Sequence, residues 1–367
     1  MGNVSSSFQQ AAWRRLRKNR GAMFGLVVIG LSVIVAVFAY YIAPDSSPNA
    51  NRIILEIGSK KPGFKKTFVL LPKDQRPVLR SFFSRLISGQ EDFYQHVPVN
   101  GYKIRGRDSI VICRYIDEGV EDTVAYATGD VPFAFIKYNI QEKKFLLGTD
   151  KFGRDILSRL IVGTRVSLSV GLITVIISLS IGLLLGSLAG YFRGKTDDII
   201  MWFINVIWSI PTLLLVFAIT LALGKGFWQV FIAVGLTMWV NVARLVRGQV
   251  LAVRELEYVE ATKALGFSNI RTIVRHIWPN IMGPVMVIAA SNFASAIVIE
   301  AGLSFLGVGV QPPQPSWGLM IKENYNFIIT QNPMLALAPG FAIMLLVLAF
   351  NLLGNGLRDA LNVRGRI

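Results

Sequence analysis

Residues 253–280 read VRELEYVEATKALGFSNIRTIVRHIWPN, a charged stretch between apolar runs that are long enough to cross a membrane. Val253 to Leu265 contains good helix formers and neither Gly nor Pro, which predicts a helix. Gly266 follows where a left-handed C-terminal cap is needed, a conformation that Gly adopts without strain. Because Ser268 can cap a second helix, the stretch predicts a helix–glycine–helix elbow held against a membrane domain.

The second helix of this elbow has an apolar stripe and a terminating proline. Positions i, i+3, i+4 and i+7 are all branched apolar residues: Ile270, Ile273, Val274 and Ile277. This spacing predicts one buried face on a helix. Pro279 is expected to end the helix at its own position, because proline lacks the backbone N–H that a helix interior uses.

Glu260-Ala261-Thr262, followed by Gly266 and Pro279, resembles the EAA loop of ABC importer permeases. These are the membrane subunits of binding-protein-dependent transporters. Thr262 replaces the second Ala of the family pattern, and Trp278 stands where Leu is usual. The resemblance implies that Glu260, Ala261, Thr262, Gly266 and Pro279 form a coupling helix docked in a cytoplasmic ATPase. An ordinary amphipathic cytoplasmic loop is the alternative.

A second match, LGTDKFGRDILSRLI at residues 147–161, is longer and more specific. It resembles the segment before the second span in permeases of dipeptide and oligopeptide importers. The positions that carry it are Gly148, Thr149, Asp150, Gly153, Arg154 and Asp155. The pattern of residues 155–161 predicts an amphipathic helix at the membrane interface. We interpret the Asp and Arg residues as salt bridges and helix caps rather than as a catalytic set.

Four further positions are candidates for structural or pathway roles or belong to an external family segment. Glu300 places a carboxylate near an apolar run, which is costly and marks either a functional site or a residue that caps or pairs at the outer interface. Pro211 should bend the third span; the family often has Asp where this chain has Asn205. Ser316 and Trp317 resemble an external Pro-Ser-Trp-Gly segment of the family, and Trp317 suits an interfacial anchor.

Composition agrees with a membrane protein. The chain is 53% hydrophobic and 16% charged, with a mean hydropathy of +0.50 and a net charge of +16. Membrane proteins carry Lys and Arg in cytoplasmic loops, and no zinc-ligand set or basic-helix pattern points to nucleic acid. The single cysteine allows no intrachain disulfide, and two histidines give little basis for a metal site.

Six runs are long enough to cross the hydrocarbon core: residues 23–43, 166–192, 199–224, 227–243, 281–299 and 333–357. The alternative for the first run is a cleaved signal peptide. Basic residues flank the runs so that both termini and the loop 244–280 are expected in the cytoplasm. The expected fold is an all-α polytopic membrane protein of the bacterial cytoplasmic (inner) membrane. The resemblance implies the type I ABC importer permease fold.

Residues 44–147 differ in character, and we expect an extracytoplasmic, mixed, strand-rich insert between residues 1–43 and the core 148–367. The β-prone runs are 52–57, 67–71, 109–116, 123–127 and 132–140, with a short helix at 76–86. The family resemblance does not reach residues 44–144. The insert is either a docking or gating surface or a decoration without a transport role.

The leading hypothesis is therefore a permease subunit that imports short peptides by alternating access. The family implies a second permease, two cytoplasmic ATPases and an external substrate-binding protein. No Gly-x-x-x-x-Gly-Lys-[Ser/Thr] loop occurs in this chain, so ATP and Mg²⁺ are expected in the partner ATPases. We expect no catalytic residue, metal or cofactor in this chain. Import of nickel or another small solute, and a membrane enzyme or sensor, are the alternatives.

Overall fold

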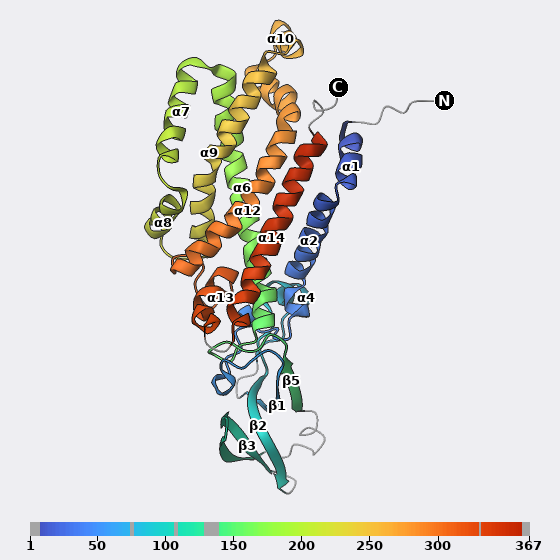
Figure 1. Cartoon of the computed structure of the whole chain (residues 1–367), viewed down its shortest axis with the longest axis vertical. Helices are drawn as coiled ribbons and strands as arrows, with labels where there is room; N and C mark the ends of the chain where they lie inside the picture. Colours follow the sequence, from blue (N-terminus) through green and yellow to red (C-terminus); the bar gives the residue numbers. More distant parts are fainter. Residues whose placement is uncertain (1–7, 74–76, 106–108, 128–138, 330–331, 362–367) are drawn as a thin grey trace, which may run out of the picture. The chain divides into compact units, whose positions relative to one another are not determined.

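A computed structural model describes residues 8–73, 77–105, 109–127, 139–329 and 332–361 (Figure 1). Contacts between Cα atoms divide the chain into two compact units. The first contains Met1–Val33, Ser167–Gln311 and Ala342–Ile367. The second contains Ile34–Val166 and Pro312–Phe341.

The chain is mainly helical. Its α-helices are α1 (Phe8–Lys18), α2 (Arg20–Val37), α3 (Ala39–Ile42), α4 (Phe82–Ser88), α6 (Ile156–Phe192), α7 (Gly194–Trp208), α8 (Thr212–Leu223), α9 (Phe227–Arg254), α10 (Glu257–Ala264), α11 (Asn269–Thr272), α12 (Trp278–Leu306), α13 (Trp317–Asn324) and α14 (Met334–Leu361). Among the described residues, five helices are long and apolar enough to cross a membrane, or six if the bent pair α7 and α8 is one span.

The third predicted span is broken. Helices α7 and α8 meet at 91° across a break of three residues that ends at Pro211. Proline has no N–H to donate and disfavours helical backbone in the residue before it, which accounts for the break. The pair is a broken span or a re-entrant loop by its geometry, so the count of six spans stays a prediction.

A stripe of small residues on α6 lets α9 approach closely in the first unit. A Cβ added at Gly186 would lie 2.5 Å from the Ala243 carbonyl oxygen, and one at Gly182 would lie 2.5 Å from the Val242 side chain. Gly190 faces Val250 in the same way. Close packing of helix backbones through small residues is how membrane helices associate.

Replacing Gly186 by leucine should therefore destabilise the helical unit by about 1–3 kcal/mol, the usual cost of overpacking. The thermal unfolding midpoint in detergent measures this. A Cβ added at Gly248 on α9 would meet none of the described residues outside its own helix backbone within 4 Å, so Gly248→Leu is the matched control. An unchanged midpoint for Gly186→Leu would mean that the two helices do not pack through this stripe.

The strand-rich insert predicted in the second unit is present as one antiparallel sheet. Its strands are β1 (Phe64–Pro72), β2 (Tyr94–Arg105), β3 (Ser109–Asp117), β4 (Val120–Ala127) and β5 (Ile140–Phe145). The order is β4-β3-β2-β1-β5, as Figure 1 shows in part. Apolar residues cover both faces: Phe68 and Leu70 on one, Val69 and Val97 on the other.

Two details of the insert differ from expectation. The strand predicted at residues 52–57 is wrong, because Leu55–Ile57 is a 3-10 turn that buries Ile54 and Ile57 together against Phe68. Strand β2 was not predicted at all. It contains Pro98 and a register shift between Val99 and Gly101, features that weaken a strand pattern in sequence.

The other expected elements match in part. Predicted strands at 67–71, 109–116 and 123–127 lie within β1, β3 and β4. The short helix expected at 76–86 is α4, which begins at Phe82 after the cap Ser81. Of the run 132–140, residues 132–138 lie outside the described part, and Ile140 begins β5.

His96 is buried in the sheet between two charged partners. Its Nε2 lies 2.7 Å from Asp92 Oδ2, and its Nδ1 lies 3.2 Å from Lys143 Nζ. Burial lowers the pKa of His96, with further repulsion from Arg52 and Lys143. The folded insert thus holds a neutral imidazole that accepts from Lys143 and donates to Asp92.

The insert should lose stability as pH falls below the ordinary histidine pKa of about 6.5, because the unfolded chain then binds a proton that the folded chain refuses. His96→Gln, which keeps a donor and an acceptor, should remove this dependence, whereas His276→Gln outside the insert should retain it. The temperature at which Cys113, the only cysteine, becomes reactive to maleimide reports unfolding of β3. Equal pH dependence in all three proteins would contradict the assignment.

Candidate functional site

The elbow is closed by hydrogen bonds at the end of α10. Gly266 has φ +73°, in the left-handed region. Its N–H donates to the Lys263 carbonyl at 2.9 Å, and the Phe267 N–H donates to the Thr262 carbonyl at 3.0 Å. This pair of bonds is a Schellman motif, so the left-handed cap predicted from the sequence is confirmed. The predicted first helix is shorter than expected, since α9 runs on to Arg254 and α10 starts at Glu257.

The second helix of the elbow begins as predicted but does not end at Pro279. Ser268 Oγ accepts the Arg271 N–H at 3.4 Å, which caps α11. A π-turn at Ile273–Ile277 then leads directly into α12, whose first turn holds Pro279. The expectation that Pro279 ends the helix is wrong. Proline is tolerated in the first turn of a helix, where its N–H is not needed, and the π-turn resets the register there.

Only half of the predicted apolar stripe is buried. Ile273 and Ile277 pack against Val259 and Tyr191, whereas Ile270 is 76% exposed and Val274 46% exposed. The first unit packs against one side of the elbow only, so Ile270 and Val274 face away from it. The tip therefore carries apolar side chains that the first unit does not cover.

The motif residues of the elbow divide between its surface and its interior. Glu260, Ala261, Gly266 and Pro279 are exposed. Thr262, the departure from the family pattern, is buried, and its Oγ1 lies 3.2 Å from Thr272 Oγ1 on α11. Trp278, the other departure, donates from Nε1 to Ser187 Oγ at 2.9 Å. Thr262 thus joins α10 to α11, and Trp278 joins the start of α12 to α6.

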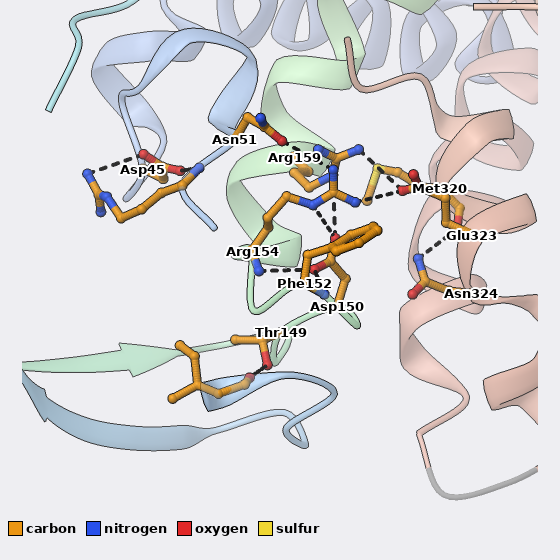
Figure 2. Close-up of polar contacts among 12 residues, drawn as sticks. Asp45, Asn51, Thr149, Asp150, Phe152, Arg154, Arg159, Met320, Glu323 and Asn324 are labelled. Atoms are coloured by element: carbon orange, nitrogen blue, oxygen red, sulfur yellow. Dashed lines mark hydrogen bonds and ion pairs between the residues drawn. The ribbon is translucent and has the colours of Figure 1, made fainter. Parts of the chain in front are cut away.

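The segment 148–155 builds a buried ion cluster in the second unit (Figure 2). Arg154 lies 2.6 Å from Asp150 and 2.8 Å from Glu323. Arg159 lies 3.5 Å from Glu323 and 4.0 Å from Asp150. The two guanidinium groups and two carboxylates balance in charge, and all but Glu323 are less than 5% exposed. Removing one member of such a buried ion pair destabilises a protein, because it leaves a buried charge without a partner.

The remaining residues of this segment shape its backbone. Gly148 and Gly153 have φ of +80° and +72°, and a Cβ at Gly153 would lie 1.7 Å from the Ile54 carbonyl oxygen. Thr149 Oγ1 accepts the Lys60 N–H at 3.0 Å and donates to the Ile57 carbonyl.

Asp155 caps α6, accepting the Ser158 N–H at 2.9 Å, and burial raises the pKa of its carboxyl. Caps and salt bridges are therefore both present. The helix predicted at 155–161 begins at Ile156 as the first turns of α6, in which Ser158 and Arg159 are buried. Its place at the membrane interface stays a prediction.

Ser316 and Trp317 also form part of this second unit. Ser316 Oγ accepts the Leu319 N–H at 3.1 Å and caps α13. Trp317 is 3% exposed and donates from Nε1 to the Leu160 carbonyl at 3.0 Å. The interpretation of Trp317 as an interfacial anchor is wrong, because its ring fills the space over Gly163 and its N–H is satisfied inside the protein.

Glu300 lies inside α12, which continues past the predicted end of the fifth span to Leu306. Its carboxylate is fully buried and accepts from Ser304 Oγ at 2.6 Å. Ser304 Oγ in turn accepts the Val310 N–H at 3.0 Å. The carboxylate thus anchors the turn after α12 through Ser304.

A cleft of about 390 Å³ lies in the first unit beside the α7–α8 break. Its polar lining consists of side-chain amides and hydroxyls: Thr212, Thr237, Asn241, Ser291, Asn292 and Ser295. No charged side chain of the described residues lines it. Sequence reasoning did not select these positions, although Asn241 and Asn292 stand out as amides near or within apolar runs.

Together these features describe a protein with several helices long and apolar enough to cross a membrane, an exposed elbow and an uncharged polar cleft. Residues 182–366 match the family "Binding-protein-dependent transport system inner membrane component", and residues 7–60 match the "N-terminal TM domain of oligopeptide transport permease C". The chain therefore belongs to the family of inner membrane components of binding-protein-dependent transport systems, in its peptide ABC permease branch.

Individual relatives agree with this membership. The glutathione transport system permease protein GsiD of Pectobacterium atrosepticum is 42% identical over 216 residues, covering 59% of this chain and 71% of the relative. The oligopeptide transport system permease protein OppC of Bacillus subtilis is 40% identical, covering 61% and 73%. The dipeptide transport system permease protein DppC of Lactococcus lactis subsp. cremoris is 31% identical, covering 98% and 91%. This last alignment spans most of the insert, so the expectation that family resemblance stops at residues 44–144 is wrong.

Proposed function

We propose that the chain is a translocating subunit of an ATP-driven importer for short peptides. The observation that carries the proposal is the elbow, whose backbone is fixed by its own hydrogen bonds while Glu260, Leu265 and Ile270 remain exposed. A rigid element with an uncovered apolar and charged tip suits docking into a cytoplasmic ATPase. The peptide substrate is proposed from the substrates in the names of the relatives.

The elbow transmits motion through α12. The π-turn joins α11 to α12 without a loop, and Val259 and Ile277 are fully buried in the cluster that also holds Val250 of α9. A displacement of the docked elbow must therefore move α9 and α12 with it. Two discrete arrangements of such packed helices are sufficient for alternating access, with ATP binding favouring one and hydrolysis restoring the other.

The cleft beside Pro211 is our candidate for part of the translocation path. Amide and hydroxyl side chains such as Asn241, Asn292 and Ser295 can hydrogen-bond to peptide backbone groups. An uncharged lining accepts peptides without selecting for the charge of their side chains. In this proposal Pro211 shapes the cleft by breaking the helix, and Glu300 holds the turn after α12 instead of contacting substrate.

The partners that the proposal requires are a second permease, two ATPases that hold ATP and Mg²⁺, and an external binding protein. Both termini and the elbow face the cytoplasm of a bacterium in this arrangement, because basic residues flank the apolar runs on that side. The segments with motif residues 148–155 and 316–317 then face outward.

Reconstitution tests the proposed function. The chain is placed in proteoliposomes with its co-purifying subunits and binding protein, and uptake of labelled di- and tripeptides is compared with uptake of Ni²⁺. ATP-dependent accumulation of peptide supports the proposal. Accumulation of Ni²⁺ alone would reassign the substrate, and absence of any ATPase from the purified complex would favour a sensor or an enzyme.

A further inference from the structure

A short segment of the insert exposes an unusual concentration of large apolar side chains. Five of them, here called the α4 patch, are Val78 (84% exposed), Leu79 (79%), Phe82 (57%), Phe83 (73%) and Ile87 (65%). Single exposed apolar residues are normal, but a contiguous group marks an interaction surface. None of the functions described above uses this segment.

The backbone beneath the patch is held at both ends. Ser81 Oγ caps α4 by accepting the Ser84 N–H at 3.4 Å. At the other end, Arg165 donates to the carbonyls of Leu86 and Ile87, both at 3.0 Å. Arg80 donates to the Ser88 carbonyl at 3.2 Å. Because these bonds fix the backbone of the segment, its apolar side chains are held in their exposed positions.

The patch adjoins the end of a membrane-spanning run. The Tyr41 and Phe82 rings lie 5.4 Å apart, and the Tyr41 hydroxyl donates to the Phe82 carbonyl at 3.3 Å. The charge-free run 23–43 is about 30 Å long at ~1.5 Å per residue, which matches the hydrocarbon core. Tyr41 near its end is therefore at the headgroup level, where tyrosine is enriched. Helix α4 contacts α3, the short helix that contains Tyr41.

The side chains beside the Tyr41–Phe82 contact are also apolar or basic. Phe38 and Ile42 of the spanning run are 43% and 48% exposed, as expected for side chains that face lipid. The Arg85 guanidinium lies 4.9 Å from the Tyr41 ring centre, so a cation accompanies the tyrosine near the end of the run. Apolar side chains with basic neighbours are the composition of an interfacial anchor.

We propose that the α4 patch inserts into the outer leaflet of the membrane and anchors the insert to the lipid surface. Leu79, Phe82, Phe83 and Ile87 enter the boundary between headgroups and acyl chains, continuing the lipid-facing surface of Phe38 and Ile42. The anchor does not depend on ATP coupling or on the substrate, so it goes beyond the proposed function.

Depth-dependent fluorescence quenching tests this anchor. In a Cys113→Ser background, Phe83→Cys and Leu79→Cys are each labelled with an environment-sensitive NBD fluorophore. The purified chain, with the subunits that accompany it, is reconstituted in phosphatidylcholine–phosphatidylglycerol vesicles containing doxyl-labelled lipid. Val120→Cys is the matched control, because Val120 is 51% exposed at the start of β4, a strand that pairs with β3.

We expect blue-shifted emission at positions 79 and 83 and several-fold stronger quenching by shallow doxyl lipid than at position 120. Blue-shifted emission without quenching would show that a protein partner covers the patch, which overturns the proposal. Water-like emission at 79 and 83, equal to that at 120, would overturn it as well.

Discussion

Replacing Gly266 by valine is expected to lower ATP-dependent uptake by about tenfold or more while the chain remains in the membrane. The residue has φ +73°, and a left-handed conformation costs an L residue about 1–2 kcal/mol, more for a β-branched one. Since about 1.4 kcal/mol is a factor of ten in an equilibrium, the docked geometry of the elbow would be depopulated accordingly. Uptake and ATP hydrolysis are measured together in proteoliposomes.

The structure supplies sharp controls for this variant. A Cβ added at Gly266 would meet none of the described residues beyond its two chain neighbours within 4 Å, so the expected defect is one of backbone conformation and not of crowding. Gly266→Asn should then retain most uptake, because asparagine tolerates the left-handed region. Gly248→Val on α9, also uncrowded but with ordinary helical backbone, should likewise retain most uptake. Wild-type uptake by Gly266→Val would contradict the coupling role.

Replacing Glu323 by alanine is expected to destabilise the protein by about 3–5 kcal/mol, the usual consequence of breaking a buried ion pair. The change leaves Arg154 and Arg159 buried side by side with Asp150 as the remaining carboxylate. Their mutual repulsion then has no second anion to offset it. The unfolding midpoint in detergent and the yield of membrane-inserted protein measure the effect.

Lys322→Ala is the matched control, because Lys322 is the exposed neighbour on the same helix. Glu323→Gln, which keeps the shape and one acceptor, should fall between the two. If Glu323→Ala and Lys322→Ala unfolded at the same temperature, the ion cluster would have no structural role, and the matched motif residues would need another explanation.

Local chemistry explains why the elbow was predictable. Gly266 and Ser268 act on backbone groups within a few residues, so their caps follow from sequence spacing alone. Pro279 was misread because its effect depends on the π-turn before it, which adds a residue to the helical register. The exposure of Ile270 likewise depends on which side of the elbow meets the helical unit.

Long-range contacts explain what the sequence did not reveal. Asp150 and Arg154 were recognised as a motif, but Glu323 comes from α13, far along the chain, and no spacing rule joins them. Trp317 has the composition of an interfacial anchor, and only packing over Gly163 shows that it is buried. Strand β2 depends on its neighbours β1 and β3, which override the local effect of Pro98.

Site-specific photo-crosslinking from the elbow in living cells tests most directly whether the elbow docks into an ATPase. A photoreactive amino acid replaces Ile270, which is 76% exposed at the tip, and Val120 of the insert serves as the reference position. We expect position 270 to form a covalent adduct with a phosphate-loop ATPase and position 120 to form none. Absence of an ATPase adduct at position 270, in protein that is inserted and present at normal levels, would contradict docking of the elbow into an ATPase.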